Sequence, residues 1–162
     1  MGKTGMGLEQ LKMNYLVIHK KYGLPSFQEM NEDFHIERIA EAETELLPAE
    51  VRRWMWEKYL NYMRFLEGIL NPVNATIFIF SIIKTLSQED KKRISEIYKK
   101  LMKEEINVIK LDLEFDEKKE AEFIKRSYKM WQEIKKQLSD VLVEAEKKFE
   151  IKQEENSKGY FG

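Results

Sequence analysis

The sequence contains no cysteine and only two histidines among its 162 residues. Without a cysteine, a nucleophilic site would depend on a serine or threonine activated by His19 or His35. No serine of the chain lies in the strand, turn and helix pattern that exposes a catalytic serine. The sequence therefore argues against nucleophilic catalysis.

Long hydrophobic runs are also missing. No uncharged apolar run reaches the ~18 residues needed to cross a bilayer, and the first ten residues, MGKTGMGLEQ, lack the apolar core of a secretory signal. We therefore expect a soluble cytoplasmic protein with no membrane partner.

A surplus of positive charge is absent as well. The formal net charge is -1 and the isoelectric point is near 6.2. A protein that binds nucleic acid independently of sequence needs an excess of lysine and arginine facing the phosphates, so no DNA partner is expected. The basic face between Lys91 and Lys103 keeps association with RNA or the ribosome as an alternative.

Charge of both signs is abundant. Charged residues make up 35% of the chain, with 24 glutamates and 22 lysines, and hydrophobic residues make up 43%. The charge bias is typical of proteins from hot environments, and the length fits one domain with its own core. We predict a single domain over residues 1–152 and a disordered polar tail over residues 153–162.

Apolar residues recur at spacings of three and four along most of the chain, which predicts helices. The main helices are expected at residues 8–21, 49–70, 87–106 and 116–151. Gly23 and Pro25 end the first of these, and Ser26 with Glu29 forms a capping box that starts a short helix. One or two short helices are expected near the N-terminus. The predicted fold is all-α, an antiparallel bundle of four main helices.

Two segments are harder to assign. Residues 75–83, ATIFIFSII, are apolar on all sides and fit a buried strand or the most buried helix. A helix is favoured, because a strand would need a partner for its backbone amides. Residues 109–116, IKLDLEFD, alternate between apolar and polar, which predicts a short extended segment near residues 109–115.

Arg52 is the most informative charged residue, because helical spacing places it within the apolar arc of its helix. A buried guanidinium needs a partner. Glu41 or Glu45 on another helix would supply it, or else the anion of a ligand. Trp54 points away from the same arc, which is typical of an interface aromatic or of a helix buried on both sides.

One short motif has the spacing of metal ligands. Glu32 and His35 form a Glu-x-x-His pair, one quarter of the ligand set of a di-iron bundle. The chain has no second such pair, so no metal or cofactor is predicted. The acidic residues Glu41 and Glu45 are more simply explained as part of a solvated face.

The segments YGLPSF and NEDFHIERI, the dipeptide NP after the long helix and DEKKEAEFIK near the start of the last helix resemble small uncharacterised helical proteins encoded in archaeal genomes. The resemblance would cover most of the chain. It implies an archaeal, thermophilic source and carries no activity.

The functional hypothesis is a non-catalytic helical interaction or scaffold module. Its partner would be another protein or a second copy of the chain, as in a homodimer held by the long last helix or by the aromatics of the Trp54 helix. The alternative from another class is a carboxylate-based or metal-dependent enzyme in a bundle cleft, built around Glu32, His35, Glu41, Glu45 and Arg52.

Overall fold

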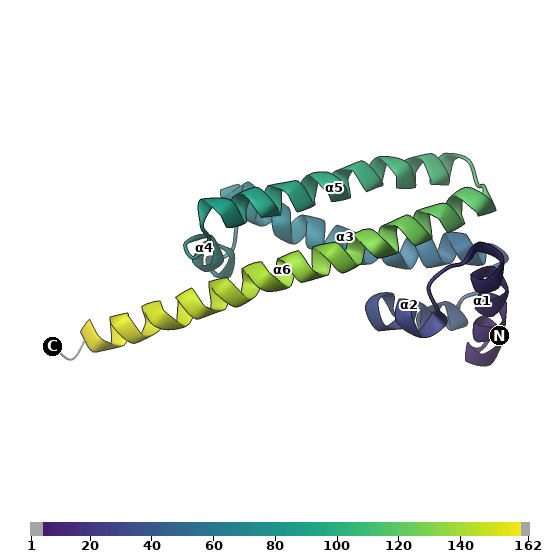
Figure 1. Ribbon diagram of the computed structural model, residues 1–162, viewed down its shortest axis with the longest axis horizontal. Helices are drawn as coiled ribbons and strands as arrows, with labels where there is room; N and C mark the ends of the chain where they lie inside the picture. Colours follow the sequence, from purple (N-terminus) through teal and green to yellow (C-terminus); the bar gives the residue numbers. More distant parts are fainter. Residues whose placement is uncertain (1–4, 160–162) are drawn as a thin grey trace. The chain divides into compact units, whose positions relative to one another are not determined.

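The computed structural model describes residues 5–159, and within them it contains helices and no strand (Figure 1). The predicted all-α helical bundle is therefore confirmed. In chain order the elements are α1 (Leu8–Tyr22), α2 (Phe27–Phe34), the 3₁₀ helix η1 (Ile36–Glu41), α3 (Leu47–Leu70), the 3₁₀ helix η2 (Pro72–Asn74), α4 (Ile77–Ile83), α5 (Gln88–Leu113) and α6 (Glu117–Gly159).

Local signals in the sequence set the first helix ends. Gly23 adopts the left-handed conformation at φ 64°, and its N–H donates to the carbonyl of His19. Ser26 and Glu29 form the predicted capping box, with the Glu29 amide donating to Ser26 Oγ at 3.2 Å and the Ser26 amide donating to Glu29 Oε2 at 2.7 Å. The first two helix boundaries therefore follow the prediction.

The later helices also begin at side-chain caps. The Asp90 amide donates to Ser87 Oγ at 3.0 Å, and the Ser87 amide donates back to Asp90 Oδ2 at the same distance. The Lys119 amide donates to Asp116 Oδ1, so Asp116 caps α6, close to the start predicted for the last helix. These caps satisfy amides that have no partner within their own helix.

The extended segment predicted near residues 109–115 is wrong, because α5 continues as a helix to Leu113. The apolar residues that alternate with polar ones in this segment are not all buried. Leu111 is buried, whereas Ile109 and Leu113 are exposed on the helix surface. The segment follows a well-formed helix without interruption, and a lone strand would leave its amides unpaired.

The last helix extends further than expected. Residues 153–159, which we predicted to begin a disordered tail, are helical and exposed as the end of α6. Glutamate, lysine and glutamine have high helix propensity, which favours continuation from the packed part of α6. Residues 160–162 lie outside the described part of the chain.

The described residues group into two compact units. Unit 1 holds the residues up to Asn61 together with Glu104–Met130, and unit 2 holds Tyr62–Lys103 together with the residues from Trp131 onward. The helices α3, α5 and α6 each contribute one segment to both units. The single domain over residues 1–152 therefore stays a prediction.

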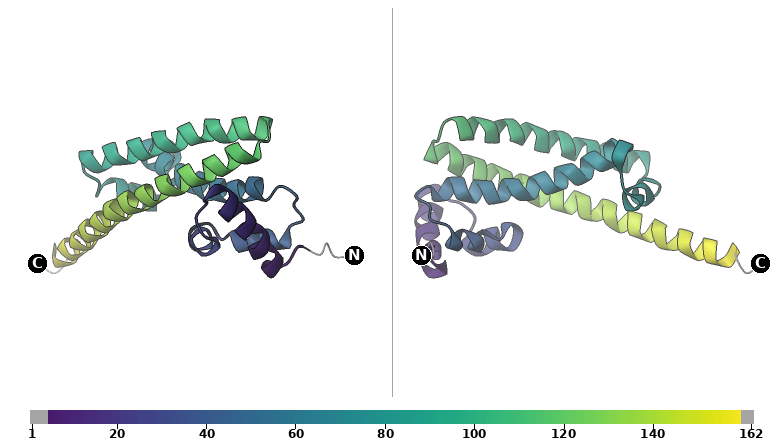
Figure 2. Two further views of the ribbon diagram at one scale, coloured as in Figure 1. Left: turned by 45° about the vertical axis from the view of Figure 1, so that its right-hand side comes forward. Right: turned by 180° about the vertical axis from the view of Figure 1, so that it is seen from behind.

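Unit 1 encloses the N-terminal helices and one part of each long helix. The α6 residue Arg126 binds Glu104 of α5, and both views of Figure 2 show the end of α5 beside the start of α6. These two segments run antiparallel. The core of this unit includes Leu11, Tyr15, Ile36, Ile39, Val51, Met55, Tyr59, Phe123 and Ile124.

Two contacts show the direction of α3 in unit 1. Arg52 contacts Glu120, and Tyr59, seven residues later, donates from its hydroxyl to the carbonyl of Ser127. The partners in α6 are also seven residues apart, so these segments of α3 and α6 run parallel. The antiparallel relation that we predicted holds between α6 and α5, because these two helices follow each other through a short turn.

Unit 2 is built around the end of α3, the start of α5 and the second part of α6. Its core includes Met63, Leu66, Ile69, Leu86, Ile94, Ile97, Leu101, Trp131, Ile134, Leu138 and Val141. The short helix α4 also belongs to this unit. It starts at Thr76, whose hydroxyl accepts from the Ile79 amide at 3.3 Å.

Candidate functional site

Arg52 is buried and paired within unit 1. Its Nε donates to Glu120 Oε2 at 2.6 Å, and one of its terminal nitrogens donates to Asp112 Oδ1 at 2.8 Å. The side chain of Glu120 is fully buried, whereas that of Asp112 is 64% exposed. Of the two alternatives that the sequence left open, a carboxylate on another helix or the anion of a ligand, the structure shows the first, with the carboxylates supplied by α5 and α6.

Burial and ion pairing have opposite effects on the pKa values of Glu120 and Arg52. Burial raises the pKa of Glu120, and this effect outweighs the opposing pull of the Arg52 guanidinium. Burial also acts to lower the pKa of Arg52, but the hydrogen bonds to Glu120 and Asp112 raise it overall. The other carboxylate oxygen of Glu120, Oε1, is buried with no hydrogen-bond partner among the described residues. Since burial of the two charges offsets much of their mutual attraction, the intact pair is weak evidence of net stabilisation, whereas loss of one partner would leave the other charge buried.

Glu41 and Glu45 are not the partners of Arg52. Both side chains are exposed, Glu41 at the end of η1 and Glu45 in the turn before α3. Trp54 is half-buried, with the Arg38 guanidinium 5.6 Å from the centre of its ring. Arg38 therefore covers part of the surface that we expected Trp54 to offer to a partner.

Glu32 and His35 are exposed and do not face a metal site. His35 ends α2 in the left-handed conformation at φ 52°, so it lies one residue outside the helix that holds Glu32. Among residues 5–159, no group of three or more histidine, aspartate and glutamate side chains is arranged to hold a metal ion. In the other histidine, His19, the ring atom Nδ1 lies 2.6 Å from the carbonyl oxygen of Leu24.

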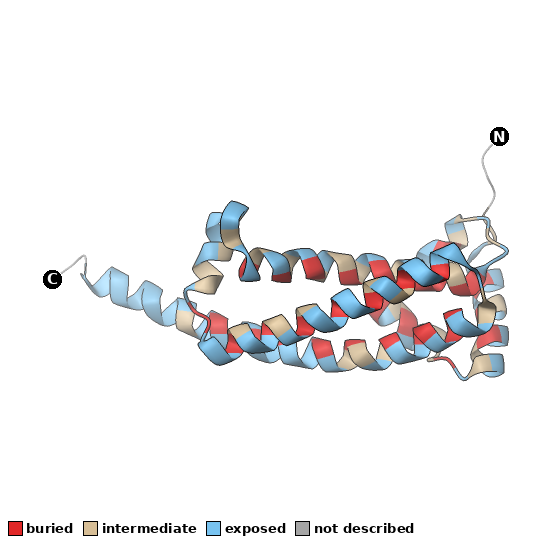
Figure 3. Cartoon of the chain, turned by 90° about the horizontal axis from the view of Figure 1, so that it is seen from above, coloured by how far each residue is buried: buried red, intermediate tan, exposed pale blue. Residues whose placement is uncertain are grey.

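Unit 2 presents a different surface. The helix α4 was expected to be buried, yet none of its seven residues is. Ile77 is 87% exposed and Phe78 is 67% exposed. Figure 3 shows the same contrast, with no buried residue in α4 and many in the long helices. We call the following exposed residues the α4 patch: Val73, Ile77, Phe78, Phe80, Leu142 and Phe149.

A groove of about 360 Å³ lies between α4 and α6 within unit 2. Its lining is apolar at Phe78, Ile82, Leu142, Ala145 and Phe149 and polar at Ser81, Thr85 and Glu146. Glu146 is the one charged residue of this lining. The volume falls in the range of ~300–1,000 Å³ seen for ligand pockets, although the shape is that of an open groove.

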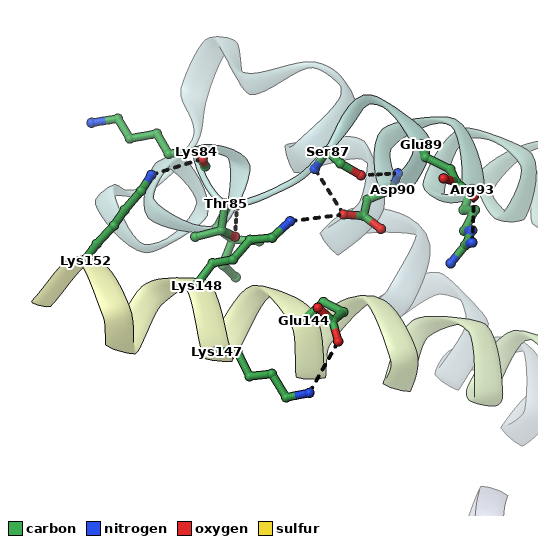
Figure 4. A network of polar contacts seen from close by, with 11 residues as sticks. Lys84, Thr85, Ser87, Glu89, Asp90, Arg93, Glu144, Lys147, Lys148 and Lys152 are labelled. Carbon is green, nitrogen blue, oxygen red and sulfur yellow. Dashed lines mark hydrogen bonds and ion pairs between the residues drawn. The ribbon is translucent and has the colours of Figure 1, made fainter. Parts of the chain in front are cut away.

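Two lysines of α6 contact residues that follow α4. Lys152 Nζ donates to the carbonyl of Lys84 at 3.3 Å, and Lys148 Nζ lies 4.0 Å from Asp90 Oδ2. Both lysines point from α6 towards the connection between α4 and α5 in Figure 4. The Lys84 side chain is exposed, and in Figure 4 it extends away from α6. The Lys84 ammonium group at the C-terminal end of α4 therefore has no acidic partner within residues 5–159.

The sequence held signals for both sites that we did not use. Glu120 precedes the buried Ile124 by four residues, so it lies on the apolar face of α6. Residues 68–83 contain no charged residue in a chain that is 35% charged. A charge-free stretch that contains a Pro and two Asn residues can mark an exposed interface as well as a core.

Comparisons of the chain with protein-family models, with curated proteins and with solved structures found no match. Within residues 5–159, every helix is too short or too polar to span a lipid bilayer.

Proposed function

We propose that the protein is a non-catalytic helical interaction module whose binding surface is the α4 patch with its groove. The observation that carries this proposal is a seven-residue helix with apolar residues at six positions and none of them buried. An isolated helix of this length is unstable in water. We therefore attribute the presence of α4 to a function that needs the exposed apolar side chains of this helix.

The size of the patch supports the same conclusion. With ~200 Å² for a fully exposed large side chain, the exposed fractions of the six residues amount to on the order of 700 Å². The largest apolar patch of a typical monomer is ~300–600 Å², whereas one side of a standard protein interface buries ~800 Å². The α4 patch is therefore closer to an interface than to an ordinary surface.

The shape of the groove suggests the kind of partner. A helix that lays an apolar face into a groove places its anchors at spacings of three and four residues. Phe78 and Ile82 on one wall and Leu142 and Phe149 on the other supply apolar contacts along the groove, and Thr85 supplies a polar one. An amphipathic helix fits this arrangement.

The test is a selection of displayed helical peptides against the full chain. Peptides that use the groove will bind the unaltered protein and will lose at least ten-fold in affinity on Leu142→Glu, because the new charge would be buried on binding. The matched control is Val143→Glu on the same helix. Leu142 and Val143 are 40% and 44% exposed, but only Leu142 lines the groove.

Two results would oppose the proposal. One is a selection that enriches no peptide above the level found with Leu142→Glu. The other is a set of peptides that bind both variants equally well, since these would bind elsewhere on the chain. Circular dichroism of both variants checks that they fold.

A further inference from the structure

We infer that the partner of the α4 patch is a second copy of this chain, bound as a two-fold symmetric dimer. The inference rests on the proposed function and names its partner. In such a dimer each copy lays the outer face of its α4 into the groove of the other. The same surface is used twice, as a two-fold interface requires.

The α4 patch contains both parts of such a contact. Ile77 and Phe80 are exposed but do not line the groove of their own chain, so they are available to project from it. The groove supplies the receiving surface through Leu142 and Phe149. A chain that carries both a projecting helix and a matching apolar groove can satisfy both in one symmetric contact.

The area fits a dimer of moderate stability. Each copy would contribute its exposed apolar surface, which is on the order of 700 Å². Polar atoms at the rim of the patch would add to this area. The total is close to the ~1,600 Å² of a standard interface. A dimer of this size leaves little of the patch in contact with water.

Charge at the ends of the contact favours the same partner. Glu146 is the one charged residue in the groove lining, and Lys84 ends α4 with an exposed side chain. We place Lys84 of each copy beside Glu146 of the other, and two-fold symmetry repeats this contact, so the dimer contains two ion pairs. Within one chain, Lys84 and Glu146 form no ion pair with each other in the described part of the structure.

The first experiment is sedimentation equilibrium of the full chain over a range of concentrations. We expect a reversible dimer, at least ten-fold weaker association for Leu142→Glu, and unchanged association for Val143→Glu. A protein that stays monomeric at all concentrations overturns the inference. Equal association of the Leu142→Glu variant and the unaltered chain also overturns it, because the dimer would then use another surface.

The second experiment tests the charge pairs between copies. Lys84→Glu and Glu146→Lys should each weaken the dimer about ten-fold, because each places like charges together twice. A mixture of the two variants forms heterodimers in which both pairs have opposite charges, so association should return to the level of the unaltered protein. Absence of this recovery overturns the proposed pairing and the two-fold arrangement that it defines.

The results distinguish this inference from the proposed function. A monomer that binds selected peptides through the groove keeps the interaction module and replaces the second copy by another helix. A monomer that cosediments with phosphatidylglycerol vesicles, and does so less as Leu142→Glu, makes a lipid surface the partner. A monomer with neither property removes both proposals.

Discussion

Loss of Arg52 should destabilise the protein more than loss of its buried partner Glu120. Arg52 is the one hydrogen-bond partner of the Glu120 carboxylate among the described residues, whereas Arg52 itself also binds Asp112. Arg52→Met should therefore cost about 3–5 kcal/mol, because it leaves a buried carboxylate without its partner. Glu120→Met should cost less, about 1–2 kcal/mol, because Arg52 keeps Asp112.

The double variant should recover most of this loss. Methionine at both positions replaces the ion pair by apolar side chains of similar length, which in other proteins is close to neutral. Since the two single costs sum to about 4–7 kcal/mol, a double variant that is close to neutral implies a coupling energy of more than about 3 kcal/mol between Arg52 and Glu120. Asp112→Asn is the control and should cost less than about 1 kcal/mol, because Asp112 is mostly exposed.

The pH dependence of Arg52→Met checks the cause. Burial raises the pKa of Glu120 above its ordinary value of 4.5, and loss of the guanidinium raises it further. A carboxyl with a raised pKa gives its full stability below the unfolded pKa and loses it as pH rises through the folded pKa. The variant should therefore be less destabilised at about pH 5 than at about pH 7.

Urea unfolding followed by circular dichroism measures the unfolding free energies of the four variants and of the unaltered protein. Equal costs for Arg52→Met and Asp112→Asn would refute the reasoning, since the buried pair would then contribute no more than an exposed one. Strict additivity of the two methionine substitutions would refute it as well, because it would mean that Arg52 and Glu120 do not interact.

Two further predictions concern helix ends. Gly23→Ala should destabilise the protein by about 1–2 kcal/mol in thermal unfolding, because Gly23 is left-handed at φ 64°, whereas Gly159→Ala near the end of α6 should change little. Hydrogen bonds from Ser87 and the nearby Lys148 overcome the effect of burial and lower the pKa of Asp90. The stabilisation that the Asp90 carboxylate provides is complete above pH 3.8, its ordinary pKa, and is lost as pH falls through the folded pKa. The difference in unfolding free energy between the unaltered protein and Asp90→Asn, measured in urea, should therefore shrink in acid.

The helices of this protein were largely predictable because their ends depend on local chemistry. Gly23, the Ser26 and Glu29 pair, the Ser87 and Asp90 pair and Asp116 each act within a few residues along the chain. Such signals are readable without knowledge of the tertiary structure.

Burial was less predictable, because it depends on which helices meet. Leu111 and Leu113 look alike in the sequence, yet Leu111 is buried and Leu113 is 81% exposed. The same limit applies to α4, where apolar composition predicted a core helix and the structure has a surface one. The partners of Arg52 lie 60 and 68 residues away, a distance that periodicity along one helix does not reach.

The measurement that tests the central claim most directly is amide hydrogen exchange of the full chain, with and without a saturating groove peptide and at low and high protein concentration. Exposed helices with few buried contacts exchange rapidly. We predict rapid exchange in Ile77–Ile83 of the free chain. Exchange there should be slower when a peptide or a second copy of the chain occupies the groove. The exchange of α2 should not change. Exchange in Ile77–Ile83 that is independent of both peptide and concentration would contradict the claim that α4 is a binding surface.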